Sequence, residues 1–148
     1  MLFVVMLLLP FLDRAWRLPQ LQNKFGNHLV WAVLIAVIAA VMLYQPQAAT
    51  FVLRNGLQTA LPEEWFFRAY LMVQVGSGVS ANLVTSLIFS ILHGLSRDWT
   101  TALLVFVPSL LYGWLYQKTR DFVLLVLVHA LSNVIYVVFA ARWLSDIQ

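Results

Sequence analysis

Long apolar stretches separated by short polar connections run through the whole chain. Between them lie turn-forming groups such as Gly76-Ser77-Gly78. A membrane-spanning helix needs about 20 apolar residues, so the shorter stretches predict helices that extend into their flanks or lie in a locally thin bilayer. The pattern predicts an all-α, polytopic transmembrane helical bundle of about six helices, with a four-helix core over about residues 50–140 that carries the polar motifs. The apolar stretches are about residues 1–12, 29–44, 50–75, 81–93, 101–116 and 122–139.

Composition supports the membrane class. Of the 148 residues, 62% are hydrophobic and only 10% are charged, whereas a soluble domain carries roughly a quarter charged residues. The mean hydropathy is +0.85. We therefore expect one integral membrane domain over residues 1–148, with the lipid bilayer as its surroundings. The basic residues are scattered, so the net charge of +3 does not indicate nucleic-acid binding. The sequence contains no cysteine, which excludes disulfides and thiol catalysis, and it does not indicate an oligomeric state.

Basic residues predict an orientation in the membrane. Arg14, Arg17 and Lys24 follow the first apolar stretch, and Lys118 and Arg120 precede the last one. Basic residues accumulate in cytoplasmic connections of membrane proteins. Alternation of the stretches then places the first and fifth connections inside and both termini outside.

The third apolar stretch carries two acidic residues and one basic residue, and ionisable groups at membrane depth are costly enough to suggest function. Glu64 and Arg68 are four residues apart with the acid first, the spacing of an ion pair on one helix face. Glu63 lies about 100° round the helix from Glu64. We therefore expect Glu64 and Arg68 to form a supporting pair. Glu63 is then free to face a cavity and to take a proton from water.

Two later stretches carry His93, and His129 followed four residues later by Asn133. His129 and Asn133 share a helix face, and an imidazole beside a carboxamide can donate hydrogen bonds to a developing oxyanion. Glu63 and His93 would hold and deprotonate a water molecule, so the predicted chemistry is acid–base catalysis without a covalent intermediate. No serine lies in an arrangement that indicates a nucleophile.

Positions along the helices predict that these groups meet. We place residues 75, 81 and 122 at one membrane surface, as alternation of the stretches requires. Glu63, His93 and Asn133 then lie roughly 16–18 Å into the bilayer, and His129 lies roughly 10 Å into it, at about 1.5 Å per residue. Three helices therefore deliver polar groups to one level, with His129 about one turn lower.

The order Glu-Glu-x-x-x-Arg, Phe-x-x-x-His and His-x-x-x-Asn resembles the CAAX protease and bacteriocin-processing enzyme family. These are glutamic-type intramembrane endopeptidases related to the Ras-converting CAAX endopeptidase. The blocks are residues 63–68, 89–93 and 129–133, and the resemblance covers about residues 61–138. It implies that Glu63 and His93 activate water and that His129 and Asn133 form the oxyanion site. It also implies a membrane-associated protein or peptide substrate, no cofactor and no metal, in a multi-pass protein that we expect in a prokaryotic cytoplasmic membrane. Ala69 stands where the family often has glycine.

Other functions remain open from the sequence. Glu63, His93 and His129 could supply the two-histidine, one-carboxylate ligand set of a zinc-dependent membrane protease, although no His-Glu-x-x-His motif is present. The same polar residues could also serve a non-catalytic bacteriocin-immunity or binding protein, or a proton-coupled carrier. A carrier is disfavoured because the sequence shows no repeated halves.

Overall fold

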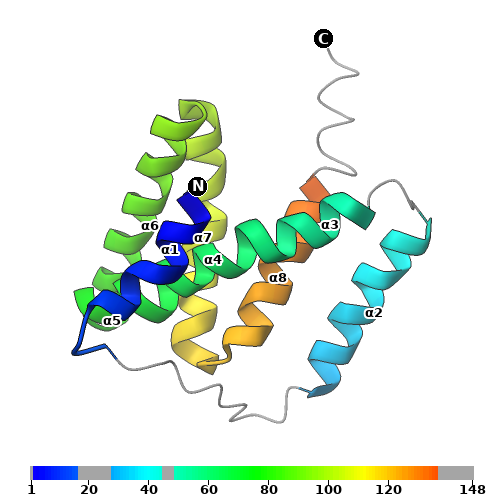
Figure 1. Ribbon diagram of the computed structural model, residues 1–148, viewed down its shortest axis with the longest axis horizontal. Coiled ribbons are helices and arrows are strands. Elements are labelled where there is room, and N and C mark those ends of the chain that lie inside the picture. The colour runs from blue at the N-terminus through cyan, green and yellow to red at the C-terminus, as the bar shows by residue number, and fades with distance from the viewer. Residues whose placement is uncertain (1, 17–27, 45–48, 137–148) are drawn as a thin grey trace.

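The computed structural model describes residues 2–16, 28–44 and 49–136, and within these ranges the chain forms six continuous helices and no strand (Figure 1). The all-α class predicted from the apolar pattern is confirmed. The basic residues Arg17 and Lys24, and the last part of the sixth apolar stretch, lie outside the described residues. The helices are α1 (Leu2–Leu8, extended by the 3₁₀ turn η1, Leu9–Leu12), α2 (His28–Tyr44), a long helix from Ala49 to Val75, α6 (Gly78–Ser96), α7 (Trp99–Thr119) and α8 (Phe122–Ile135).

The long helix alternates between α-helical and π-helical segments. Pro62 lies in the first turn of α4, and it removes the N–H that would bond the carbonyl of Gln58. The chain therefore continues through this proline as a helix with wider turns on either side of it. π-helical turns are rare and occur frequently at functional sites. The segments of the long helix are α3 (Ala49–Asn55), η3 (Gly56–Ala60, π), α4 (Leu61–Glu64), η4 (Trp65–Leu71, π) and α5 (Met72–Val75).

The long helix crosses α6, α7 and α8 at a steep inclination (Figure 1). Its first segments, α3, η3 and α4, contact α8, whereas η4 and α5 contact α6. Helices α6 and α7 form an antiparallel pair with the most extensive contact in the described part of the chain. The crossing brings α4, with its two acidic residues, into contact with α8.

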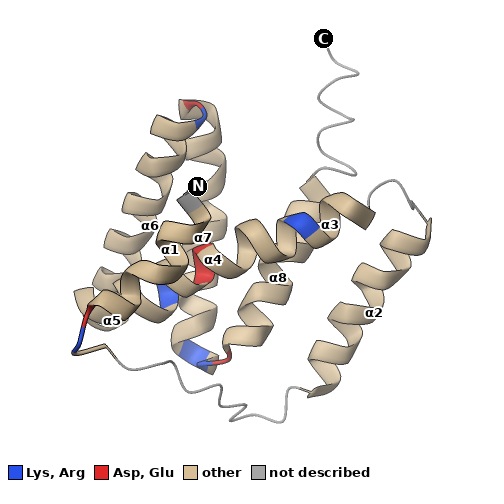
Figure 2. Ribbon diagram, in the orientation of Figure 1, with Lys and Arg blue, Asp and Glu red and all other residues tan. Residues whose placement is uncertain are grey.

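Two of the helices, α6 and α7, are long and apolar enough to cross a membrane. The 19 residues of α6 correspond to about 28 Å, close to the thickness of a bilayer core. Hydrogen bonds from Gln74 to Asp13 and from Gln117 to the carbonyl of Gly78 bring the first and fifth connections to one end of the pair. Charged residues also mark the turn between α6 and α7 at the opposite end (Figure 2). The described beginning of the first connection therefore lies at the same end as the fifth connection, and the orientation in the membrane stays a prediction.

The turn between α6 and α7 is closed by a helix cap. The side chain of Asp98 accepts hydrogen bonds from the backbone N–H of Thr101 at 2.7 Å and from its hydroxyl at 2.6 Å. These bonds stabilise the carboxylate and hold the pKa of Asp98 below its ordinary value. The cap therefore fixes the beginning of α7, next to Arg97.

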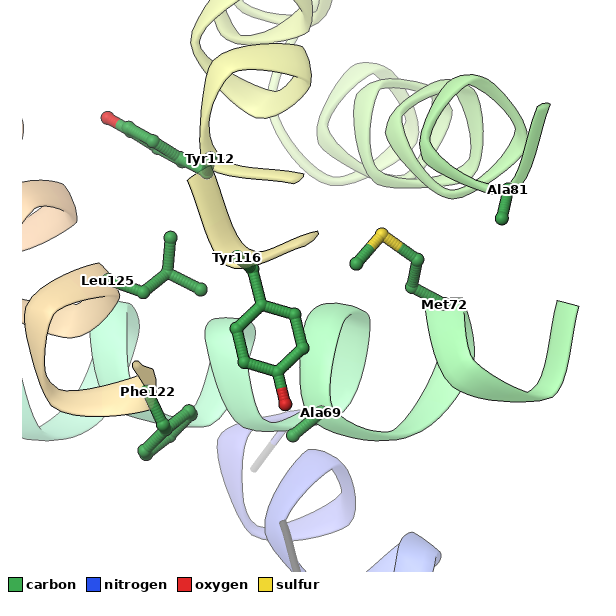
Figure 3. Packing of buried hydrophobic residues seen from close by; sticks show 7 residues of the cluster. All are labelled: Ala69, Met72, Ala81, Tyr112, Tyr116, Phe122 and Leu125. Atoms are coloured by element: carbon green, nitrogen blue, oxygen red, sulfur yellow. The ribbon is translucent and has the colours of Figure 1, made fainter. Parts of the chain in front are cut away.

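A buried cluster joins the long helix to α6, α7 and α8. Tyr116 extends from α7 toward Ala69 on the long helix, with Phe122 on one side and Met72 on the other (Figure 3). The other labelled members of the cluster are Ala81, Tyr112 and Leu125. Most large apolar side chains outside such clusters are exposed, and α2 has no buried residue, a distribution that suits helices surrounded by lipid.

Close packing of α6 on α7 depends on Gly113. A methyl group at this position would overlap the side-chain oxygen of the buried Asn82, which donates a 2.9 Å hydrogen bond to the carbonyl of Leu110. We expect Gly113→Ala to reduce the free energy of unfolding by about 1–3 kcal/mol, measured by thermal or denaturant unfolding in mild detergent. Gly56→Ala is the matched control, because its added methyl group would meet no atom within 4 Å.

The double variant Asn82→Ala/Gly113→Ala removes the overlap and tests the cause. We expect it to be less destabilised than the sum of the two single variants. Strict additivity would show that crowding against Asn82 does not explain the requirement for glycine.

Candidate functional site

A cavity of about 290 Å³ lies where the long helix crosses α6, α7 and α8. Polar groups gather on part of its wall, and apolar side chains of α3 and α7 form much of the remainder. Glu63, His93, His129 and Asn133 all line it, whereas Glu64 and Arg68 lie behind its wall and are fully buried. The other lining residues are Phe51, Asn55, Thr59, Phe89, Arg97, Thr101, Leu104, Val105, Pro108, Tyr112, Ser132 and Tyr136.

The carboxylate of Glu63 lies between the two imidazoles. Its Oε1 is 3.8 Å from Nε2 of His93, and its Oε2 is 3.7 Å from Nε2 of His129. These distances are longer than direct hydrogen bonds, and polar groups separated in this way are commonly bridged by water. Three side chains from three different helices therefore direct polar atoms to one place in the cavity.

The predicted pair of Glu64 and Arg68 is present, with Arg68 Nε 3.4 Å from Glu64 Oε2. Arg68 also donates from Nη2 to the carbonyl and the hydroxyl of Ser109 on α7, at 2.9 and 2.7 Å. The second carboxylate oxygen of Glu64 lies 2.6 Å from Nδ1 of His129. The sequence did not predict this last contact, which makes the buried pair an anchor for an imidazole of the cavity.

Each imidazole is held on its other side. Nδ1 of His93 lies 3.0 Å from the carbonyl of Phe89, one helical turn earlier, and the two rings pack with centroids 4.3 Å apart. The ring of His129 stacks on Tyr112 at 4.9 Å with an interplanar angle of 28°. Both rings therefore present Nε2 to Glu63, because Nδ1 is engaged elsewhere.

Asn133 is held by a residue that the sequence analysis missed. Its Nδ2 donates a 3.0 Å hydrogen bond to Oδ1 of Asn55, at the end of α3. A signal was available, since Asn55 is a carboxamide inside an apolar stretch, eight residues before Glu63. Spacing alone could not relate Asn55 to Asn133, because 78 residues separate them.

The polar groups meet by a different route from the one predicted. The sequence-based heights treated every helix as upright, whereas the long helix is steeply inclined to α6 and α7 (Figure 1). Glu63 is therefore brought to the two histidines by the crossing of the helices, and His129 reaches it from α8 as closely as His93 does from α6.

A zinc protease would need three metal ligands gathered at one point. Within residues 2–16, 28–44 and 49–136, no group of three or more His, Cys, Asp or Glu side chains is arranged to hold a metal ion. The carboxylate of Glu63 between two imidazoles is a donor and acceptor set that can bind a water molecule and accept its proton.

Comparison with known proteins identifies the family. The chain matches the family model described as type II CAAX prenyl endopeptidase Rce1-like over residues 45–135, more than half of its length. No curated protein and no solved structure matches the chain. The match contains all three motif blocks, and it begins before the apolar stretch that contains Asn55. The chain therefore belongs to the Rce1-like family of type II CAAX prenyl endopeptidases, which are membrane-embedded proteases.

Proposed function

We propose that this protein is a glutamic-type intramembrane endopeptidase that uses water activated by Glu63 and His93. The observation that carries the proposal is the position of the Glu63 carboxylate, 3.7–3.8 Å from two imidazole nitrogens at the wall of a cavity. One water molecule could donate one hydrogen bond to this carboxylate and the other to Nε2 of His93, because Nδ1 of His93 faces the carbonyl of Phe89 as a donor. Glu63 then acts as the general base.

In the proposed reaction, the water oxygen attacks the carbonyl carbon of the scissile peptide bond while its proton passes to Glu63. The carbonyl oxygen becomes an oxyanion. When the tetrahedral intermediate collapses, the carbon–nitrogen bond breaks and Glu63 returns the proton to the leaving amine. The products are a carboxylic acid and an amine, and no covalent enzyme intermediate forms.

His129 and Asn133 are the proposed oxyanion donors. If His129 donates from Nδ1 to Glu64, its Nε2 can donate to the oxyanion only when the ring is protonated. The contact of Nδ1 with the buried carboxylate of Glu64, at 2.6 Å, holds the ring of His129 so that Nε2 faces the cavity. Asn133 uses one amide hydrogen for Asn55, and its second hydrogen is available for the oxyanion.

The proposed substrate is a membrane-associated protein or peptide. Phe51, Leu104, Val105 and Pro108 contribute apolar surface to the cavity wall. An apolar segment could lie along this wall with a peptide bond beside Glu63. We place the enzyme in a multi-pass arrangement in a prokaryotic cytoplasmic membrane.

The function can be tested with purified protein in proteoliposomes. One probe is a peptide ending in a C-a-a-X sequence, with and without a prenyl group on its cysteine. Because the substrate is unidentified, new N-termini in membranes of cells with and without the protein provide further probes. A chelator arm distinguishes the zinc-dependent alternative, since loss of cleavage that zinc restores would contradict the proposed mechanism. Absence of any cleavage dependent on the protein would favour the binding or immunity alternative.

Asn133→Ala tests the oxyanion role. We expect kcat to fall roughly 10²–10³-fold with little change in KM, because the lost hydrogen bond forms mainly in the transition state. Gln58→Ala is the control, since Gln58 is exposed and does not line the cavity. An unchanged kcat in Asn133→Ala would remove this residue from the oxyanion site.

A further inference from the structure

Asn55, Thr59 and Glu63 follow one another at intervals of four residues and all line the cavity. The π-helical turn Gly56–Ala60 lies between Asn55 and Glu63. A π-helical turn contains more residues than an α-helical turn. The wider turn therefore helps to keep residues two turns apart on the same face of the long helix. Asn55 is thus built into the cavity wall by the same helix that carries the proposed general base.

The contact of Asn55 with Asn133 has a defined direction. Asn133 Nδ2 donates and Asn55 Oδ1 accepts, at 3.0 Å. A carboxamide has a donor end and an acceptor end, and rotation about its last bond exchanges them. With its Nδ2 bonded to Asn55, Asn133 keeps a second N–H on the donor end. The reversed amide would place an oxygen beside the developing oxyanion and repel it.

We propose that Asn55 is a positioning residue that fixes the donor end of the Asn133 carboxamide toward the oxyanion, an inference that rests on the proposed function. Asn55 acts here only through Asn133. Helices α3 and η3 both contact α8, so the two carboxamides are supported by packing on each side of their hydrogen bond. A donor held in place before the reaction need not be reoriented in the transition state, which is the main advantage of a preformed oxyanion site.

Asn55→Leu removes the acceptor while keeping a side chain of similar size. We expect kcat to fall roughly 3–10-fold, the range that one neutral hydrogen bond accounts for, with KM nearly unchanged. Gln58→Leu is the matched control, because Gln58 lies in the adjoining turn, is exposed and bonds only to Arg54 among the described residues. A loss expressed only in KM, or an equal loss in Gln58→Leu, would overturn the positioning role.

A double-variant cycle separates positioning from a general structural effect. In the Asn133→Ala background, Asn55→Leu should lower kcat by less than about twofold, because the carboxamide through which it acts is already absent. The same fold-loss of kcat from Asn55→Leu in the wild-type and Asn133→Ala backgrounds would overturn the inference.

A second readout does not depend on proteolysis. In protein labelled with ¹⁵N at asparagine, the side-chain amide signal of Asn133 should shift in Asn55→Leu and stay in place in Gln58→Leu. An unchanged signal in Asn55→Leu would contradict the contact even if cleavage is impaired. If the wild-type protein cleaves no probe, the proposed function fails while this measurement still decides whether Asn55 orients Asn133.

Discussion

Glu63→Gln should abolish proteolysis, with a fall of roughly 10²–10⁴-fold in kcat, while leaving the protein folded. The substitution is nearly isosteric, so the side chain can still fill its place between His93 and His129. A carboxamide cannot accept a proton from water at neutral pH, and the base is therefore lost. Initial cleavage rates in proteoliposomes, together with thermal unfolding in detergent, measure the two parts of this prediction.

Asp13→Asn is the matched control for Glu63→Gln. It makes the same chemical change in a carboxylate that bonds to Gln74, away from the cavity. Its cleavage rate should stay within about twofold of the wild-type rate. If Glu63→Gln unfolds normally and retains full activity, Glu63 is not the general base.

Arg68→Met should give the largest loss of stability, about 3–5 kcal/mol in the free energy of unfolding. Both Arg68 and Glu64 are 0% exposed, so the substitution leaves a buried carboxylate without its cation. It also removes two hydrogen bonds to Ser109 and the contact of the guanidinium with the ring of Phe89, 5.1 Å away. Unfolding in mild detergent measures the effect, and activity should fall as well, because Glu64 holds His129.

The double variant Glu64→Gln/Arg68→Met tests whether the unpaired charge causes this loss. We expect it to recover part of the stability, because removal of both charges avoids the cost of a single buried one. Arg54→Met on the same helix is the control. Arg54 is exposed, so this substitution should change the free energy of unfolding by no more than about 0.5 kcal/mol. If the losses in free energy of unfolding of the two single variants simply add in the double variant, the effect of Arg68→Met comes from lost packing and not from the unpaired charge.

Local spacing predicted a large part of this site. Glu64 and Arg68 are four residues apart on one helix, so helical periodicity alone was enough to predict their ion pair, which is confirmed. The same periodicity placed Glu63 on a different face, and it lines the cavity. The catalytic roles of Glu63, His93, His129 and Asn133 stay predictions, although the four side chains share one cavity.

Contacts between residues far apart in the sequence could not be predicted from residue spacing. Glu64 with His129, Arg68 with Ser109, and Asn55 with Asn133 are separated by 65, 41 and 78 residues. No periodicity connects such positions, because their proximity depends on how the long helix crosses its neighbours. The π-helical turns also left no clear pattern in the sequence beyond Pro62 and Gly56.

The amino-acid sequence by itself determined the all-α membrane class, the approximate positions of the helices and the kinds of chemical group available. It could do so because apolar length and helical periodicity are local properties of the chain. Only the tertiary structure decided which nitrogen of each histidine faces Glu63, which residue anchors Asn133, and how the buried pair supports His129. These features depend on the inclination and packing of helices that are far apart in the sequence.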